Sequence, residues 1–311
     1  KDLAEAVRDC DKVDRFLPIP AQAGSDDVLR AMHKPAVNIY EGPLIDLTHS
    51  LYPDLKRIVG TEGEGFIYIA NGHGAWEAAL MNVFSKGDKV LVLESGRFAV
   101  GWGDQARQMG VETEVPHAPD RLGVDPAAVE ARLRADTGHG IKAVLVVQID
   151  TASGVWNDIA AIRKAIDVTG HPALFMVDCI ASTGCVPYEM DTWGVDVTVT
   201  ACQKGLMTPP GLGFVFANDK AMAAHRQNGC PSAYWDWTAR AEPERYYKLF
   251  AGTAPVQHLF GLRQALDMIV LKFRREGAEV DIIGMNKASE TIVDKLAIHD
   301  KPGAMDALTG H

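Results

Sequence analysis

Apolar stretches alternate with helix-like patterns from about residue 65 to residue 217. A short run of apolar, often β-branched residues is typical of a strand, whereas apolar residues three and four positions apart are typical of one face of a helix. The first pattern predicts strands at residues 65–70, 88–94, 111–115, 142–149, 173–178, 195–201 and 213–217. The second pattern predicts helices at residues 75–85, 99–110, 125–136, 157–170 and 258–270.

The predicted strands are apolar on both faces. The runs "KAVLVVQI" and "ALFMVD" show no alternation of apolar and polar residues. Strands of this kind are buried on both faces, which is typical of a mostly parallel sheet covered by helices. The sequence therefore predicts an α/β fold, with a mostly parallel sheet of about seven strands flanked by helices.

The two ends of the chain lack this alternation. The stretch up to about residue 60 is rich in Pro and in mixed helix signals, and the stretch after about residue 258 is helical. We expect a large domain over residues 30–257. Residues 1–29 and 258–311 would then pack together outside the sheet as a smaller, discontinuous region.

Composition and charge narrow the functional classes. The chain carries 31 Lys and Arg against 41 Asp and Glu, and its net charge of −10 is spread along the sequence. This disfavours nucleic acid or an anionic membrane as a partner, since both require clustered basic charge.

The five cysteines lack CxxC spacing, and no apolar run approaches the ~20 residues of a membrane-spanning helix. We therefore expect a cytoplasmic protein without a bound metal.

Polar residues follow two of the predicted strands. Asn71, Gly72, His73 and Gly74 follow the first strand and open a helix, where free backbone N–H groups form an anion site. The alternative is an Asn-capped helix with a tight turn before it. Asp178 ends a wholly apolar strand, where a carboxylate is costly to bury unless it is paired. It either caps the next turn or holds a cationic group of a ligand.

Two further loops carry groups that can take part in chemistry. Thr151 and Ser153 lie just past a strand, where their hydroxyls either donate hydrogen bonds to a ligand or shape a turn. Gln203 and Lys204 follow another strand. Lys204 either takes part in the chemistry of a ligand site or is an ordinary solvated turn residue. A helix start, a buried acid and a lysine together suit pyridoxal phosphate (PLP). Its chemistry uses a lysine Schiff base, a carboxylate at the pyridine nitrogen and an anion site for the phosphate.

Several stretches of the chain occur in a familiar order and spacing. They are "NGHGAWEAAL", "SGRF", "DTASGV", "VDCIAS", "QKGLMTPPGLGFV" and "GTAPVQHLFGLRQAL". With them, the sequence from about residue 16 to residue 270 resembles the class V, fold-type I PLP-dependent aminotransferases. Within that family it is similar to the branch of alanine–glyoxylate and serine–glyoxylate aminotransferases. The resemblance implies the large-domain fold of that family and PLP as the cofactor.

The resemblance also implies roles for the residues at the ring of the cofactor. Lys204 would form the Schiff base, and Asp178 would pair with the pyridine nitrogen. Phe98 would stack on one face of the ring and Ile180 would pack on the other. Thr151 would contact the phenolic oxygen.

A second set of residues would hold the phosphate. By the same resemblance, Asn71, Gly72, His73 and Gln203 would surround it. Thr253 would reach the phosphate of the neighbouring subunit. The resemblance therefore implies a homodimer with composite active sites.

The sequence departs from the family at two places. Phe250 stands where the family has a tyrosine that reaches the partner's phosphate. The arginine that binds the substrate carboxylate lies in an "RIG" stretch near the C-terminus of the family, and this chain has no such stretch. After about residue 271 the resemblance ends, and the C-terminal part looks short or divergent.

The resemblance implies transamination between a small amino acid and a small 2-oxo acid such as glyoxylate or pyruvate. The donor would be of the alanine, serine or aspartate type. Two alternatives remain open. One is a PLP lyase or desulfurase of the same fold, and the other is a PLP-binding homologue that has lost turnover.

Overall fold

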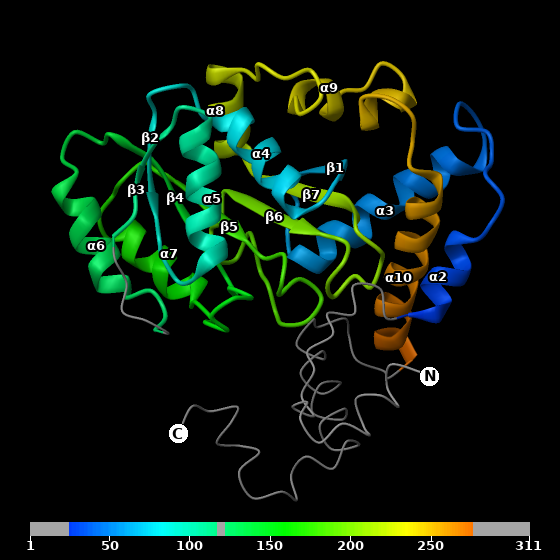
Figure 1. Cartoon of the computed structure of the whole chain (residues 1–311), viewed down its shortest axis with the longest axis horizontal. Coiled ribbons are helices and arrows are strands. Elements are labelled where there is room, and N and C mark those ends of the chain that lie inside the picture. The colour runs from blue at the N-terminus through cyan, green and yellow to red at the C-terminus, as the bar shows by residue number, and fades with distance from the viewer. Residues whose placement is uncertain (1–24, 117–121, 276–311) are drawn as a thin grey trace, which may run out of the picture.

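The computed structural model describes residues 25–116 and 122–275 (Figure 1). These residues contain a seven-stranded sheet with the order β1-β7-β6-β5-β4-β2-β3. Strand β7 runs antiparallel to β1 and β6, and the other neighbours are parallel. The prediction of a mostly parallel sheet of seven strands is confirmed. The strands are β1 (Glu64–Ala70), β2 (Lys89–Val92), β3 (Glu112–Glu114), β4 (Ile141–Val147), β5 (Leu174–Asp178), β6 (Val197–Ala201) and β7 (Gly211–Ala217).

Helices cover both faces of this sheet (Figure 1). One face is covered by α4 (Gly72–Val83), α5 (Arg97–Gln108) and α8 (Asp219–Asn228). The other face is covered by α3 (Pro43–Val59), α6 (Pro126–Ala135) and α7 (Ile159–Asp167). The predicted helices of this region are therefore present, with ends that differ by a few residues from those expected.

The alternation of side chains along each strand builds two apolar layers. In β4, Val144 and Val146 pack in the layer that contains Ile162 of α7. Ala143 and Leu145 point to the opposite face and pack in the layer of α4 and α5. Because both faces are buried, the strand shows an unbroken apolar run instead of an alternating one.

The described parts of the two chain ends lie side by side. Helix α2 (Asp26–Met32) packs against α10 (Val256–Arg275), and α10 also packs against α3. Arg263 of α10 forms an ion pair with Asp54 of α3 at 2.6 Å. The proposed division at residues 29/30 and 257/258 remains a prediction. Most of the smaller region, residues 1–24 and 276–311, lies outside the described residues.

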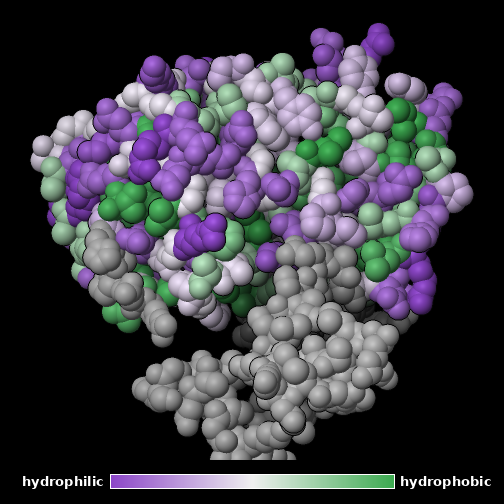
Figure 2. All heavy atoms as spheres, viewed as in Figure 1, coloured by the Kyte–Doolittle hydropathy of each residue, from purple (hydrophilic) through white to green (hydrophobic). Residues whose placement is uncertain are grey.

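A connecting segment between α8 and α10 lies against the edge strand of the sheet. It contains the short helix α9 (Trp237–Ala241) and the 3-10 turn η1 (Tyr246–Phe250), and it packs against β1. Figure 2 shows one face of the molecule, on which apolar side chains lie in small groups between polar ones. In the part of the chain that the structure describes, no helix is both long and apolar enough to span a membrane.

Candidate active site

The loops that follow β1, β2, β4, β5 and β6 meet at one edge of the sheet. These strands run in the same direction, so their carboxyl ends lie together, the usual place for a ligand in an α/β sheet. The loops enclose a cavity of about 380 Å³, which we call the central cavity. Every residue predicted to contact the cofactor lines it except Thr253: Asn71, Gly72, His73, Phe98, Thr151, Asp178, Ile180, Gln203 and Lys204.

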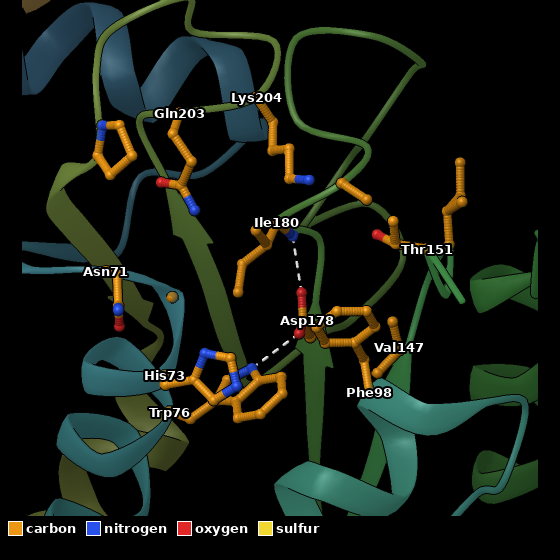
Figure 3. A pocket seen from close by; sticks show the side chains of 14 residues that line it. Asn71, His73, Trp76, Phe98, Val147, Thr151, Asp178, Ile180, Gln203 and Lys204 are labelled. Atoms are coloured by element: carbon orange, nitrogen blue, oxygen red, sulfur yellow. Dashed lines mark hydrogen bonds between the residues drawn. The ribbon is translucent and has the colours of Figure 1, made fainter. Parts of the chain in front are cut away.

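Figure 3 shows how these side chains face the cavity. Gln203 and Lys204 approach from one side, and His73 and Trp76 approach from the other (Figure 3). Asp178 lies between the two groups. An amine, a carboxylate and a helix start therefore face the same space, although they are far apart in the sequence.

The loop after β1 carries the start of helix α4. Asn71 caps the helix, because its side-chain oxygen accepts a hydrogen bond from the backbone N–H of Gly74 at 3.2 Å. The predicted Asn cap is thus present. Gly72 and His73 occupy the first helical positions, where backbone N–H groups lack an intrahelical partner. The same turn therefore also presents donors and the positive end of a helix dipole to the cavity.

Gly72 is required at this position by space. A Cβ atom on Gly72 would lie 2.4 Å from Cδ1 of Ile180. Ile180 follows β5 and itself lines the cavity. The absence of a side chain at Gly72 therefore lets the start of α4 approach the loop after β5.

Asp178 is buried at the end of β5, with 2% of its surface exposed. Its Oδ1 atom accepts a hydrogen bond from the backbone N–H of Ile180, and its Oδ2 atom accepts one from Nε1 of Trp76, both at 2.7 Å. The bond to Ile180 confirms that the carboxylate caps the next turn. Burial raises the pKa of Asp178 to about 7, and the nearby carboxylate of Asp150 adds to that shift. Among the described residues, none forms an ion pair with Asp178.

Lys204 lies in the turn directly after β6 and is partly buried. Its side chain extends into the central cavity (Figure 3). Within residues 25–116 and 122–275, its Nζ atom has no hydrogen-bond or ion-pair partner. The predicted place at a strand end is confirmed, and the lysine faces a cavity formed by other loops.

The turn after Lys204 is tightly packed. A Cβ atom on Gly205 would lie 2.3 Å from the backbone oxygen of Thr183. Met207 has a positive φ of 54°, an uncommon conformation for a residue with a side chain. Its backbone N–H donates to the carbonyl of Lys204 at 2.9 Å. These contacts fix the backbone that carries Lys204.

Thr253 does not line the central cavity of its own chain. It lies between η1 and α10 and is exposed. Phe250, at the end of η1, is fully buried and packs against Tyr246 with ring centroids 5.9 Å apart. The ring at the position of the family's tyrosine therefore packs in the core of its own chain.

The sequence reasoning missed one residue that lines the cavity, Trp76, and one that contacts its wall, Asp150. Trp76 is 1% exposed and packs in the core, yet it also lines the cavity and donates a hydrogen bond to Asp178. The signal was its spacing, because residues three apart share one face of a helix and His73 was already a candidate. Asp150 directly precedes Thr151, and its carboxylate accepts hydrogen bonds from backbone N–H groups in the first turn of α5. The sequence gives no sign of these contacts.

The chain belongs to the class-V aminotransferase family, whose pattern matches residues 44–294. It is 41% identical over 259 residues to a serine–glyoxylate aminotransferase of Methylorubrum extorquens, covering 81% of this chain and 63% of that protein. It is 36% identical over 223 residues to an L-aspartate–glyoxylate aminotransferase of Paracoccus denitrificans, covering 71% and 56%. The family predicted from the sequence motifs is confirmed.

The fold agrees with this family. The crystal structure of a pyridoxamine–pyruvate aminotransferase from Mesorhizobium loti matches with a TM-score of 0.72 and 25% identity, covering 83% of this chain and 65% of that one. The chain thus spans less than two thirds of the length of the relatives described here. Class-V aminotransferases work with PLP, so family membership implies this cofactor.

The residues of the central cavity fit this cofactor. The start of α4 supplies unpaired N–H groups for a phosphate. Gln203 has a buried amide oxygen without a hydrogen-bond partner in the described residues, so its side chain has unused hydrogen-bonding capacity there. Asp178 offers a carboxylate for a protonated ring nitrogen, and Lys204 offers an amine for an aldehyde.

Proposed function

We propose that this chain is the cofactor-binding part of a PLP-dependent aminotransferase. It would move the amino group of a small amino acid to a small 2-oxo acid such as glyoxylate or pyruvate. The observation that carries the proposal is the convergence of Lys204, Asp178 and the start of α4 on one cavity. The relatives that act on serine or aspartate with glyoxylate support this choice of substrates.

Each residue has a role that follows from its place. The start of α4, with Asn71, and the amide of Gln203 would bind the phosphate. Phe98 and Ile180 would hold the ring between them, and Thr151 would donate to its phenolic oxygen. All five line the central cavity.

Lys204 and Asp178 would carry the chemistry. Lys204 would attach the cofactor through its Nζ atom and, once released, would move the proton at the Cα atom of the substrate. Asp178 would keep the ring nitrogen protonated. When bound, PLP supplies an electron sink that stabilises negative charge at that carbon. The burial of Asp178 excludes water from this pairing.

The two alternative functions are less well supported. A lyase or desulfurase would share the fold, but the two relatives reported above at 41% and 36% identity are aminotransferases. A homologue without turnover would still bind PLP through the same residues. The two differ from the proposal in whether bound PLP takes up an amino group from a donor.

The active enzyme would be a homodimer in which Thr253 reaches the phosphate site of the partner subunit. The exposure of Thr253 outside its own cavity supports this arrangement. We also keep the cytoplasm as the proposed location. The cysteines recorded as free are Cys179, Cys185, Cys202 and Cys230, which agrees with a reducing compartment.

A panel of donors tests the proposal. The purified chain, incubated with PLP, should turn yellow and convert the cofactor to its amino form with serine, alanine or aspartate. Adding glyoxylate or pyruvate should reverse the conversion. Lys204→Ala should lose covalent attachment of PLP, whereas Lys142→Ala, at an exposed position at the start of β4, should behave as wild type. A wild-type chain that stays colourless with PLP would contradict the proposal.

A further inference from the structure

Two stacked tryptophans lie beside the central cavity, and they differ in one respect. Trp76 and Trp102 have ring centroids 6.0 Å apart and an angle of 17° between their planes. Nε1 of Trp76 donates to Oδ2 of Asp178 at 2.7 Å. Nε1 of Trp102 is buried and has no partner among the described residues. The pair therefore contains one indole with a specific polar contact and one that only packs.

The contact of Trp76 completes the fixation of Asp178. The backbone N–H of Ile180, from the loop after β5, binds Oδ1. The indole of Trp76, from α4, binds Oδ2. Since each oxygen is held by a different element, the carboxylate cannot turn about its Cβ–Cγ bond without losing a hydrogen bond.

The surroundings of Asp178 determine how much this donor matters. Burial disfavours the ionised carboxylate, as does the nearby acid Asp150. The other titratable groups near Asp178 are His73 and Lys204, which line the same cavity, and Cys179, which follows Asp178 in the chain. A hydrogen bond from a neutral donor is stronger to an ionised acceptor, so the indole N–H favours the charged form.

We propose that Trp76 is a positioning residue, whose indole N–H favours the ionised form of Asp178 and holds its carboxylate in one orientation toward the cavity. The inference rests on the proposed function only for the identity of the group that Asp178 meets, the pyridine nitrogen of PLP. Trp76 thereby keeps the negative charge of Asp178 directed at that nitrogen. Trp102 supplies the packing partner and no polar contact.

The first test uses the unmodified full chain, labelled with ¹⁵N-tryptophan and freed of cofactor. The indole N–H signal of Trp76, assigned by its loss in Trp76→Phe, should shift with an apparent midpoint near pH 7, the pKa of Asp178. The shift should vanish in Asp178→Asn. The signal of Trp102 should not follow this titration. A Trp76 signal that ignores pH, or a Trp102 signal that titrates equally, would overturn the proposal.

The second test compares matched variants by urea unfolding. Phenylalanine keeps one six-membered aromatic ring at the buried position. It removes the five-membered ring of the indole together with its N–H group. Trp76→Phe should raise the pKa of Asp178 further, and ionising a carboxyl of raised pKa costs folding stability as the pH rises. Its folding equilibrium constant, relative to wild type, should therefore fall about tenfold more at about pH 9 than at about pH 5. Trp102→Phe should lose equally at both pH values.

Binding of the cofactor connects the inference to the proposed function. Trp76→Phe should hold PLP several-fold less tightly than Trp102→Phe, because the carboxylate of Asp178 would then be held only through Oδ1, by the backbone N–H of Ile180. Equal losses in the two variants would refute the role of Trp76 while PLP binding by wild type stands. A wild-type chain that does not bind PLP would refute the proposed function and leave the titration of Trp76 as the test of its contact with Asp178.

Discussion

The carboxylate of Asp150 accepts a hydrogen bond from the backbone N–H of Phe98 at 2.8 Å, and a second from Ala99 at 3.1 Å. Both donors lie in the first turn of α5, whose N-cap residue, Gly96, has no capping side chain. Asp150 therefore caps α5 from the loop after β4. Because Thr151 is the next residue in that loop, one buried carboxylate positions two walls of the central cavity.

Gly96→Ala should disturb this contact. The new Cβ atom would lie 2.4 Å from Cγ of Asp150, so the carboxylate or the start of α5 must move. We expect a loss of about 1 to 3 kcal/mol in unfolding free energy and weaker retention of PLP as Phe98 shifts. Urea unfolding and equilibrium dialysis of PLP measure the two effects. Gly138→Ala is the control, since a Cβ atom on Gly138 would have no neighbouring atom within 4 Å; equal behaviour of the two variants would contradict the role of Asp150.

The contacts of Asp150 also show where sequence reasoning ends. Unbroken apolar runs such as β4 predicted the sheet, because burial on both faces leaves a direct mark on composition. The sequence motifs placed Lys204 and Asp178 at strand ends, since each follows such a run. The bond from Trp76 to Asp178 joins residues 102 positions apart, and that from Phe98 to Asp150 joins residues 52 apart. Such pairs depend on how α4 and α5 pack, which local patterns do not specify.

Asp178→Asn should change how the stability of the cofactor-free chain depends on pH. The pKa of Asp178 in the fold is raised from 3.8 to about 7, so the fold favours the protonated acid. Wild type therefore loses stability as the pH rises from about 4 to about 7, and the loss levels off above that range. The neutral amide has no such cost.

The advantage of Asp178→Asn over wild type should grow across this pH range, by up to about 4 kcal/mol. Urea unfolding at several pH values measures it. Asp125→Asn, at the exposed cap of α6, is the control and should show no rise of this kind. A constant difference between Asp178→Asn and wild type would contradict the raised pKa.

Arg240 should be essential for the segment that carries Thr253. It is 4% exposed, and it donates to the backbone carbonyls of Ile67, Tyr234 and Leu249. These carbonyls belong to β1, to the loop before α9 and to η1. Arg240→Leu would leave them without their donor, and we expect a loss of at least about 3 kcal/mol.

The same substitution at an exposed arginine controls for the loss of charge. Arg226 lies in the last turn of α8 and is exposed. Arg226→Leu should change the unfolding free energy by about 0.5 kcal/mol or less. Similar losses in the two leucine variants, measured by urea unfolding, would show that the buried hydrogen bonds of Arg240 add nothing.

Thr253→Val should weaken PLP binding without unfolding the chain. The residue is exposed and outside its own cavity, so the proposed hydrogen bond goes to the phosphate in the partner subunit. A charge-assisted hydrogen bond of this kind is worth roughly 1.5 to 3 kcal/mol, so the dissociation constant of PLP should rise by at least about tenfold. Thr137→Val, at another exposed turn, should leave it unchanged. A loss of stability with unchanged PLP affinity would identify Thr253 as a turn residue only.

Mixed dimers test whether the site is shared between subunits. Chains with Lys204→Ala and chains with Thr253→Val would each be impaired in both sites of the proposed homodimer. In a mixed dimer with composite sites, one site contains both substitutions and the other contains neither, because Lys204 and Thr253 of one chain serve different sites. Activity per mixed dimer should therefore exceed the mean of the parents, after subunit exchange is verified by mass. If both residues served the same site, exchange would give only the mean of the two parents, and the composite site would be refuted.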